Sequence, residues 1–305
     1  MKSVNISTEK GTPKQSVPKI TLDLQGISGD AHAGPWHRQV SLLSSEDIQT
    51  FSQHMDKTID PGAFAENITT RGLDLGNMAV LDQIRCNDVL LEVTQIGKAC
   101  HGDGCAIFRE VGKCVMPKQG IFTRVIEPGT LLPGAVMEHI ERPLKIMIIT
   151  LSDRASVGHY KDRSGPKATE QLAAHFEGTR WHLNLEKHLM PDDAEKLKAQ
   201  LQAAVSQSFD AVFTLGSTGL GPRDMAPETA SALCNKTFPS VMEFIRCKYG
   251  NEIPSALLSR GIAGLAQQTL IYTLPGSVRA VEQYLTEILK TLEHAIGMIH
   301  GLDWH

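Results

Sequence analysis

A glycine-rich stretch in the second half of the chain holds residue types that can bind phosphate. Gly216, Gly219 and Gly221 lie in one predicted turn, and Asp224 lies in the same turn. Backbone N–H groups in such a turn can cradle a phosphate, and a carboxylate beside them can hold Mg²⁺ against it. The spacing matches neither the Walker nor the Rossmann fingerprint, so an ordinary turn that needs glycine for steric reasons is the alternative.

The first half holds a second group with chemical potential: Cys100, His101, Cys105 and Cys114. Thiolate and imidazole bind zinc, but this spacing lacks the Cys-x2-Cys knuckle of many structural zinc sites. A thiol there could instead be reactive, since neighbouring positive charge lowers the pKa of a thiol. Buried inert thiols are the third interpretation, above all for the remaining cysteines, Cys86, Cys234 and Cys247.

Composition limits the class of protein. The chain has 305 residues, which suggests about two domains, and 41% of them are hydrophobic, enough to build ordinary cores. The net charge of -4 gives no basic excess, which argues against a nucleic-acid surface. No apolar run reaches the roughly 18 residues that span a membrane, and the polar N-terminus is unlike a signal peptide. We expect a cytoplasmic protein without a disulfide scaffold.

The second half alternates apolar runs with helical patterns. The run at residues 146–151 predicts a buried parallel strand, and residues 210–215 and 269–274 predict two more. Helices between them predict a doubly wound α/β domain of three layers. Ligands of such sheets bind beyond the carboxyl ends of the strands. We therefore expect the segments that follow these strands to converge: residues 152–153, 216–224 and 275–276.

The first half consists of short apolar runs separated by glycine and proline. This pattern favours a mostly β domain, a barrel or a sandwich, in which only residues 45–54 look helical. Residues 138–143 are charged and contain a proline, which indicates a linker. The sequence thus predicts a β domain over residues 1–140 and an α/β domain over residues 144–305.

The stretch Leu215–Thr229 reads Leu-Gly-Ser-Thr-Gly-Leu-Gly-Pro-Arg-Asp-Met-Ala-Pro-Glu-Thr. It resembles the signature loop of molybdopterin adenylyltransferases of the MogA/MoaB type, usually Gly-Gly-Thr-Gly, then Arg-Asp, then Thr-Pro-Glu. Ser217 stands in place of the second glycine and Ala226 in place of the threonine. Four more segments resemble that family in the same order, so that the resemblance covers nearly all of this half: residues 150–165, 191–193, 256–261 and 274–277.

The resemblance implies an enzyme that uses ATP and Mg²⁺ to adenylylate molybdopterin, and it implies a homotrimer. Asp192 and Asp224 would hold Mg²⁺ or shape the nucleotide pocket. From position alone, an N-terminal helix acid or cap is the favoured interpretation of Asp192, and only its place in the family pattern reverses it. Arg260, from position alone, is a solvated arginine at a helix end. The ligand-binding residues implied by the motifs are Ser152, Asp153, Gly216, Ser217, Thr218, Gly219, Arg223, Glu228, Ser259, Arg260, Pro275, Gly276 and Ser277.

Three segments of the first half, residues 26–41, 61–69 and 94–107, resemble the MOSC domain, a β-barrel, and the resemblance covers about residues 15–137. MOSC domains are thought to bind the molybdenum cofactor or to carry sulfur on a cysteine. By this resemblance Cys105 is the functional thiol, with Cys100 as the alternate. His32 and His37, taken alone, are more often satisfied polar residues than ligands.

The two resemblances point to one pathway, molybdenum cofactor biosynthesis. The rival interpretation is a binding protein that stores or delivers the finished cofactor without turnover, and Ser217 and Ala226 leave it open. The partners expected are molybdopterin and ATP, together with other biosynthesis proteins or recipient molybdoenzymes.

Overall fold

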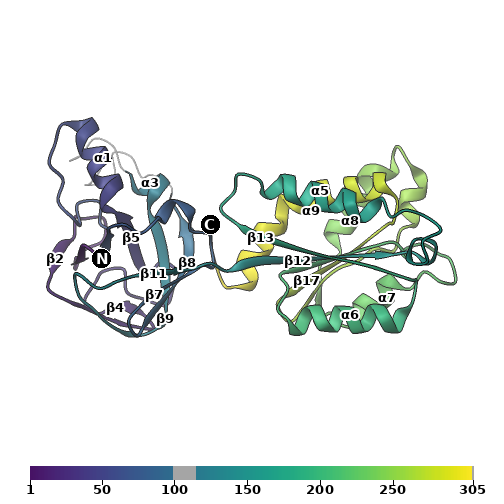
Figure 1. Ribbon diagram of the computed structural model, residues 1–305, viewed down its shortest axis with the longest axis horizontal. Helices are drawn as coiled ribbons and strands as arrows, with labels where there is room; N and C mark the ends of the chain where they lie inside the picture. The colour runs from purple at the N-terminus through teal and green to yellow at the C-terminus, as the bar shows by residue number, and fades with distance from the viewer. Residues whose placement is uncertain (99–114, 304–305) are drawn as a thin grey trace. The chain divides into compact units, whose positions relative to one another are not determined.

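Apolar runs separated by turn residues fold into two compact units, Met1–Arg142 together with residues 301–303, and Pro143–His300. A computed structural model describes residues 1–98 and 115–303. Each unit has its own buried apolar core, so each is described by itself (Figure 1).

The first unit is mostly β. Its strands are β1 (Ser3–Ile6), β2 (Gln15–Val17), β3 (Ile20–Asp23), β4 (Gly26–Ile27), β5 (Val40–Ser44), β6 (Ile68–Thr70), β7 (Gln83–Cys86), β8 (Val89–Ile96), β9 (Ile121–Glu127), β10 (Gly129–Leu131) and β11 (Glu138–Ile140). Its helical segments are α1 (Ser45–Met55), the 3-10 turn η1 (Leu75–Asn77) and α3 (Met116–Gln119). Helix α1 begins after Ser44, whose hydroxyl accepts a hydrogen bond from the N–H of Asp47, as an N-cap does.

These strands form two sheets. The larger has the order β11-β7-β8-β9-β5-β6-β1-β2, and the smaller has the order β10-β3-β4. Within the described residues, the end strands β11 and β2 do not pair, so a closed barrel is not confirmed. Apolar side chains from both sheets, such as Val4, Ile20, Leu42 and Leu91, share one buried core.

The second unit alternates strands and helices. Its strands are β12 (Pro143–Leu151), β13 (His182–Met190), β14 (Ala211–Leu215), β15 (Lys236–Thr237), β16 (Ala263–Ala266) and β17 (Thr269–Leu274). Its helices are α4 (Asp153–Ser156), α5 (Ser164–Phe176), α6 (Ala194–Ser206), α7 (Ala226–Ser231), α8 (Ser240–Gly250), the 3-10 turn η3 (Pro254–Leu258) and α9 (Val278–Ile299).

The sheet of this unit has the order β13-β12-β14-β17-β16-β15, with its first four strands parallel. Helices α5, α8 and α9 cover one face, and α6 and α7 cover the other (Figure 1). Alternate residues of β12, such as Met147 and Ile149, pack with Leu197 and Leu201 of α6, since successive side chains of a strand point to opposite faces. The three-layer α/β architecture expected from the alternating pattern is therefore present.

Two features differ from the expectation. Strands β15 and β16 add an antiparallel edge beyond β17, where no strand was predicted. The residues interpreted as a linker are also structured: β11 pairs with β7, and β12 already begins at Pro143. The charged β11 can serve as an edge strand because its outer hydrogen-bonding groups face water, and proline is tolerated as the first residue of β12.

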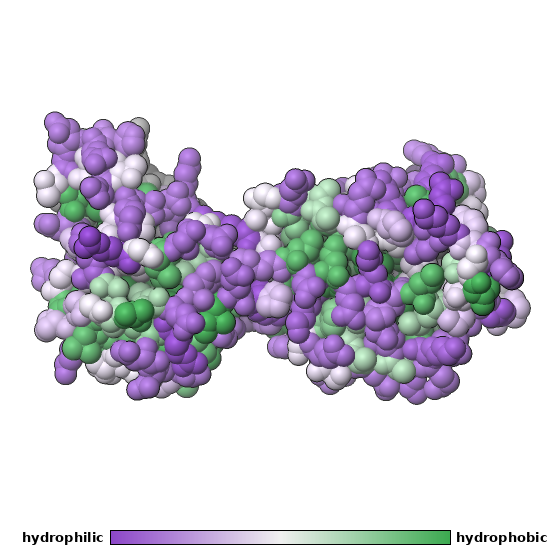
Figure 2. All heavy atoms as spheres, viewed as in Figure 1, coloured by the Kyte–Doolittle hydropathy of each residue, from purple (hydrophilic) through white to green (hydrophobic). Residues whose placement is uncertain are grey.

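Hydrophilic side chains dominate the visible face of each unit, and apolar ones gather in separate patches (Figure 2). In the second unit, Leu220, Leu257 and Leu258 are more than half exposed. Among the described helices, none is long and apolar enough to cross a membrane.

Candidate functional site

Three parallel strands of the second unit end side by side, and the segments after them converge as expected. The N–H of Gly216, after β14, donates to the carbonyl of Leu274, the last residue of β17, at 2.8 Å. Gly216 has φ +114°, and a Cβ there would lie 2.6 Å from the carbonyl oxygen of Leu151, which ends β12. Glycine is therefore required at this junction, because a side chain would force the strand ends apart.

A cavity of about 370 Å³ lies at this edge of the sheet. Its walls come from the glycine loop after β14, from η3 and Ser259, and from the turn and first helical residues after β17. Eight residues predicted from the motifs line it: Ser217, Thr218, Gly219, Asp224, Ser259, Pro275, Gly276 and Ser277. Its lining includes the hydroxyl residues Thr218, Ser255, Ser259 and Ser277 beside apolar ones such as Ile253 and Leu258, a combination suited to phosphate and to a flat ring.

Asp224 folds back over its own loop. One carboxylate oxygen, Oδ2, accepts a hydrogen bond from the N–H of Gly221 at 2.8 Å. A Cβ on Gly219 would come within 2.7 Å of the same oxygen. The glycines thus make room for the carboxylate, which explains why these residue types occur together.

Ser217 departs from the usual glycine at a position with φ +55°, a left-handed conformation that disfavours a side chain. Its hydroxyl compensates, because it donates to the carbonyl of Arg223 and accepts from the N–H of Met225, both at 3.1 Å. Ala226, the second departure, is fully buried, and its N–H donates to the carbonyl of Ser217. Both exchanges are therefore accommodated within the loop.

Arg260 is not the solvated residue that its position suggested. Its guanidinium donates to the carbonyls of Gly219 at 2.6 Å and Asp224 at 2.8 Å, and it pairs with Glu228. Arg246 supports the same segment by donating to the carbonyls of Ser259 and Gly261. Neither Arg260 nor Glu228 lines the cavity. Both hold the glycine loop in place.

Asp192 lies beside Asp153, and each carboxylate accepts the other residue's N–H, at 3.2 and 3.1 Å. Asp153 also forms an ion pair with Arg223. The cap of α6 is Asp193, which accepts from the N–H groups of Glu195 and Lys196, so the helix-cap interpretation of Asp192 is wrong.

The remaining predicted residue is the cap of a shorter helix. Ser152 caps α4 by accepting from the N–H of Ala155. Neither Ser152 nor Asp192 lines the cavity.

The two aspartates predicted to hold Mg²⁺ have suitable free atoms. Within the described residues, no donor is assigned to Oδ1 of Asp192 or Oδ1 of Asp224. Carboxylate oxygens are the ligands that Mg²⁺ prefers. Both oxygens of Asp153 are occupied by the N–H of Asp192 and by Arg223. Each of Asp192 and Asp224 therefore keeps an oxygen that can ligate a cation, whereas Asp153 does not, and of these two aspartates only Asp224 lines the cavity.

Sequence reasoning missed the helical wall of the cavity. Arg279, Gln283 and Tyr284 of α9 line it. Tyr284 is 2% exposed, and its hydroxyl has no hydrogen-bond partner within the part of the chain described. A tyrosine in place of an aliphatic residue was the one available signal.

We expect Gly216→Ala to lower the free energy of unfolding of the second unit by about 2–3 kcal/mol, because a Cβ meets both an unfavourable φ and the Leu151 carbonyl. Urea unfolding followed through the Trp181 indole, which donates to Glu293, measures it. Gly178→Ala is the control, since Gly178 has φ +73° and open space around it. Equal losses in both variants would contradict the steric argument.

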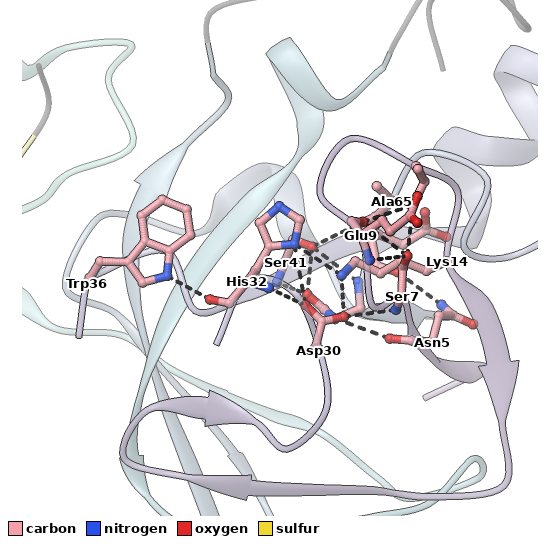
Figure 3. Close-up of polar contacts among 12 residues, drawn as sticks. Asn5, Ser7, Glu9, Lys14, Asp30, His32, Trp36, Ser41 and Ala65 are labelled. Atoms are coloured by element: carbon pink, nitrogen blue, oxygen red, sulfur yellow. Dashed lines mark hydrogen bonds and ion pairs between the residues drawn. The ribbon is translucent and has the colours of Figure 1, made fainter. Parts of the chain in front are cut away.

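The first unit buries a charged network beneath the segments predicted as MOSC motifs (Figure 3). Lys14 and Asp30 form an ion pair with side chains 1% and 0% exposed. The Asp30 carboxylate also accepts from the N–H groups of Ser7 and His32 and from the side-chain amide of Asn67. Burial by itself raises the pKa of Asp30, but the hydrogen bonds from His32 and Lys14 outweigh burial and hold the pKa well below its ordinary value.

The neighbouring Glu66 is fully buried, and burial raises its pKa. Its carboxylate accepts from the N–H groups of Gly62 and Phe64 and from the Thr69 hydroxyl, so it fixes the loop before β6. His37 is buried, and its Nε2 lies 2.5 Å from the carbonyl oxygen of Asp303. The motif residues Asp30, Glu66 and Asn67 are thus parts of one polar frame.

The structure describes three of the six cysteines, Cys86, Cys234 and Cys247. Cys100, Cys105 and Cys114, with His101, lie outside the described residues. Cys86 is buried, and burial raises the pKa of its thiol, as expected for a packing residue. Cys234 is half-buried, also with a raised pKa, whereas Cys247 is exposed, so the buried interpretation is wrong there.

Comparison with known proteins agrees with this division. Residues 147–294 match the model of the probable molybdopterin binding domain, and residues 29–138 match the model of the MOSC domain. Molybdopterin adenylyltransferase of Escherichia coli strain K12 is 31% identical over 160 residues, which are 52% of this chain and 80% of that protein. The chain belongs to the molybdopterin adenylyltransferase family through its second half. Both resemblances identified from the sequence are confirmed.

Other relatives are longer. Gephyrin of Dictyostelium discoideum is 35% identical over 160 residues, 50% of this chain and 22% of that protein. The molybdenum cofactor synthesis protein cinnamon of Drosophila melanogaster is 31% identical, with 25% of its length covered. The chain thus matches a quarter or less of these two relatives. The solved structure of the Mog protein from Mycobacterium ulcerans is 34% identical, with a TM-score of 0.46, over 51% of this chain and 98% of that one.

Proposed function

We propose that the second unit adenylylates molybdopterin with ATP during molybdenum cofactor biosynthesis. An oxygen of the pterin's terminal phosphate forms a bond to the α-phosphorus of ATP, the bond from that phosphorus to the bridging oxygen breaks, and pyrophosphate leaves. The observation that carries the proposal is the cavity at the carboxyl edge of the parallel strands, lined by eight residues of the family motifs. Membership of the molybdopterin adenylyltransferase family supports the choice of this reaction.

The chain's own groups suit this chemistry. Backbone N–H groups and hydroxyls around Thr218, Ser259 and Ser277 can bind phosphate oxygens and position both reactants. Arg260 donates hydrogen bonds to the carbonyls of Gly219 and Asp224 and so stabilises the conformation of the glycine loop. A bound Mg²⁺ would be held by Asp192 and Asp224 and would neutralise phosphate charge.

The rival function is storage or delivery of the finished cofactor. Ser217 and Ala226 raised this alternative, but the loop accommodates both. An assay of pyrophosphate release that requires both ATP and molybdopterin separates the two functions. Release that depends on both substrates supports adenylylation, whereas tight cofactor binding without release supports storage.

For the first unit we propose the role of its MOSC match, binding the molybdenum cofactor or carrying sulfur on Cys105 or Cys100. Alkylation at neutral pH, mapped by mass spectrometry with and without cofactor, identifies the thiol. We also propose that the chain assembles as a homotrimer, which light scattering tests. Other cofactor biosynthesis proteins or molybdoenzymes would be its partners.

A further inference from the structure

Two cationic side chains of the first unit lie against one indole ring. The guanidinium carbon of Arg38 is 4.9 Å from the centroid of Trp36, and the ammonium of Lys10 is 5.5 Å from it. The ring is fixed, because its Nε1 donates to the carbonyl of His32 at 2.7 Å (Figure 3). We call Lys10 and Arg38 the Trp36 cation pair.

Neither cation has an acidic partner within the described residues. Arg38 is half-buried, and its Nε is fully buried without a hydrogen-bond acceptor. A guanidinium presents five N–H donors, and taking such a charge out of water is costly unless acceptors replace the water. Cation–π attraction to Trp36 offsets part of that cost but supplies no acceptor.

The carboxylates of the adjoining frame are already engaged. Asp30 binds Lys14 and three further donors, and Glu66 is held by loop N–H groups and a hydroxyl. Two like charges beside one ring also repel each other. Among residues 1–98 and 115–303, no carboxylate therefore pairs with either cation at Trp36, and an anion placed there would balance their charge.

We propose that the Trp36 cation pair binds a tetrahedral oxyanion, either the phosphate group of a ligand or molybdate. The planar fork of Arg38 can engage two oxygens, and the mobile ammonium of Lys10 can reach a third. Identifying that phosphate with the pterin's own rests on the function proposed above. The anion site itself does not, because inorganic ions test it.

The test titrates the full chain with inorganic phosphate and, separately, with molybdate in the millimolar range. The Trp36 Nε1–H and Arg38 Nε–H signals are followed by ¹⁵N NMR. We expect saturable shifts of both signals in the wild type, and at least ~10-fold weaker binding in Arg38→Gln, since charge-assisted hydrogen bonds are lost. The ion that binds more tightly shows whether the site prefers a phosphate group or molybdate.

Arg71→Gln is the matched control, because Arg71 is an exposed arginine of the same unit and the substitution changes the net charge equally. Affinity unchanged in Arg71→Gln supports the site. The absence of saturable shifts with both ions overturns it, as does an equal loss of affinity in Arg71→Gln. If Arg38→Gln does not fold, Arg38→Lys replaces it. Weaker anion binding by Arg38→Lys, at the wild-type melting temperature, supports the role of the planar guanidinium. Unchanged anion binding by Arg38→Lys overturns that role.

Discussion

Asp224→Asn is expected to lower adenylyl transfer at least ~100-fold, the scale seen when an electrostatic partner of the transition state is removed. The loop should persist, because the asparagine carbonyl can still accept the Gly221 N–H that now binds Oδ2. What is lost is the negative charge at the cavity wall, and with it the affinity for Mg²⁺. Pyrophosphate release with saturating ATP and molybdopterin measures the effect.

Asp193→Asn is the matched control. Asp193 caps α6 through two backbone N–H groups and lies outside the cavity, and asparagine caps helices equally well. We expect near wild-type turnover in that variant. Wild-type turnover in Asp224→Asn would refute its catalytic role and shift the balance toward storage.

Lys14→Met is expected to destabilise the first unit by about 3 kcal/mol, near the lower end of the cost of breaking a buried ion pair. The variant leaves the Asp30 carboxylate buried without its ammonium, although the N–H groups of Ser7, His32 and Asn67 still bind it. Urea unfolding followed through the Trp36 indole, which donates to His32, reports on this unit.

The loss should also depend on pH. The folded-state pKa of Asp30 lies below its unfolded value, so the pair's contribution is complete above about pH 4 and fades as the pH falls toward the folded pKa. The gap between wild type and Lys14→Met should therefore narrow in acid. Arg85→Met, which removes an exposed partner of Glu127, should destabilise the unit far less, because water screens an exposed ion pair. A cost as small for Lys14→Met would contradict the role of the buried pair.

The spacing of apolar residues and the positions of glycine and proline determined much of the fold of the second unit. The continuous apolar run of β12 is buried as expected, because a parallel strand covered by helices on both faces is apolar throughout. Strand ends meet at one edge of a parallel sheet whatever the loops contain. The convergence of the glycine loop with the Leu274–Ser277 turn could therefore be inferred from the sequence.

Site membership from motifs was less complete. Asp192 and Arg260 occupy positions of the family motifs, yet their roles depend on the residues to which they are hydrogen-bonded. Arg260 binds carbonyls of a loop about 40 positions away, and Asp192 exchanges hydrogen bonds with Asp153 on another strand's loop. No local pattern encodes such pairings, because they arise only when distant segments pack together.

The sequence by itself determined the buried parallel strands β12, β14 and β17 and the glycine loop of the second unit, since these follow from local periodicity and from the backbone freedom of glycine. The tertiary structure decided which polar residues are buried. Lys14 lies in a polar segment, which is typical of solvated chain. Only the fold buries its side chain together with that of Asp30. Likewise, only the fold brings Lys10 and Arg38 to one indole ring. Burial and electrostatic environment depend on contacts across the chain, so a linear pattern cannot specify them.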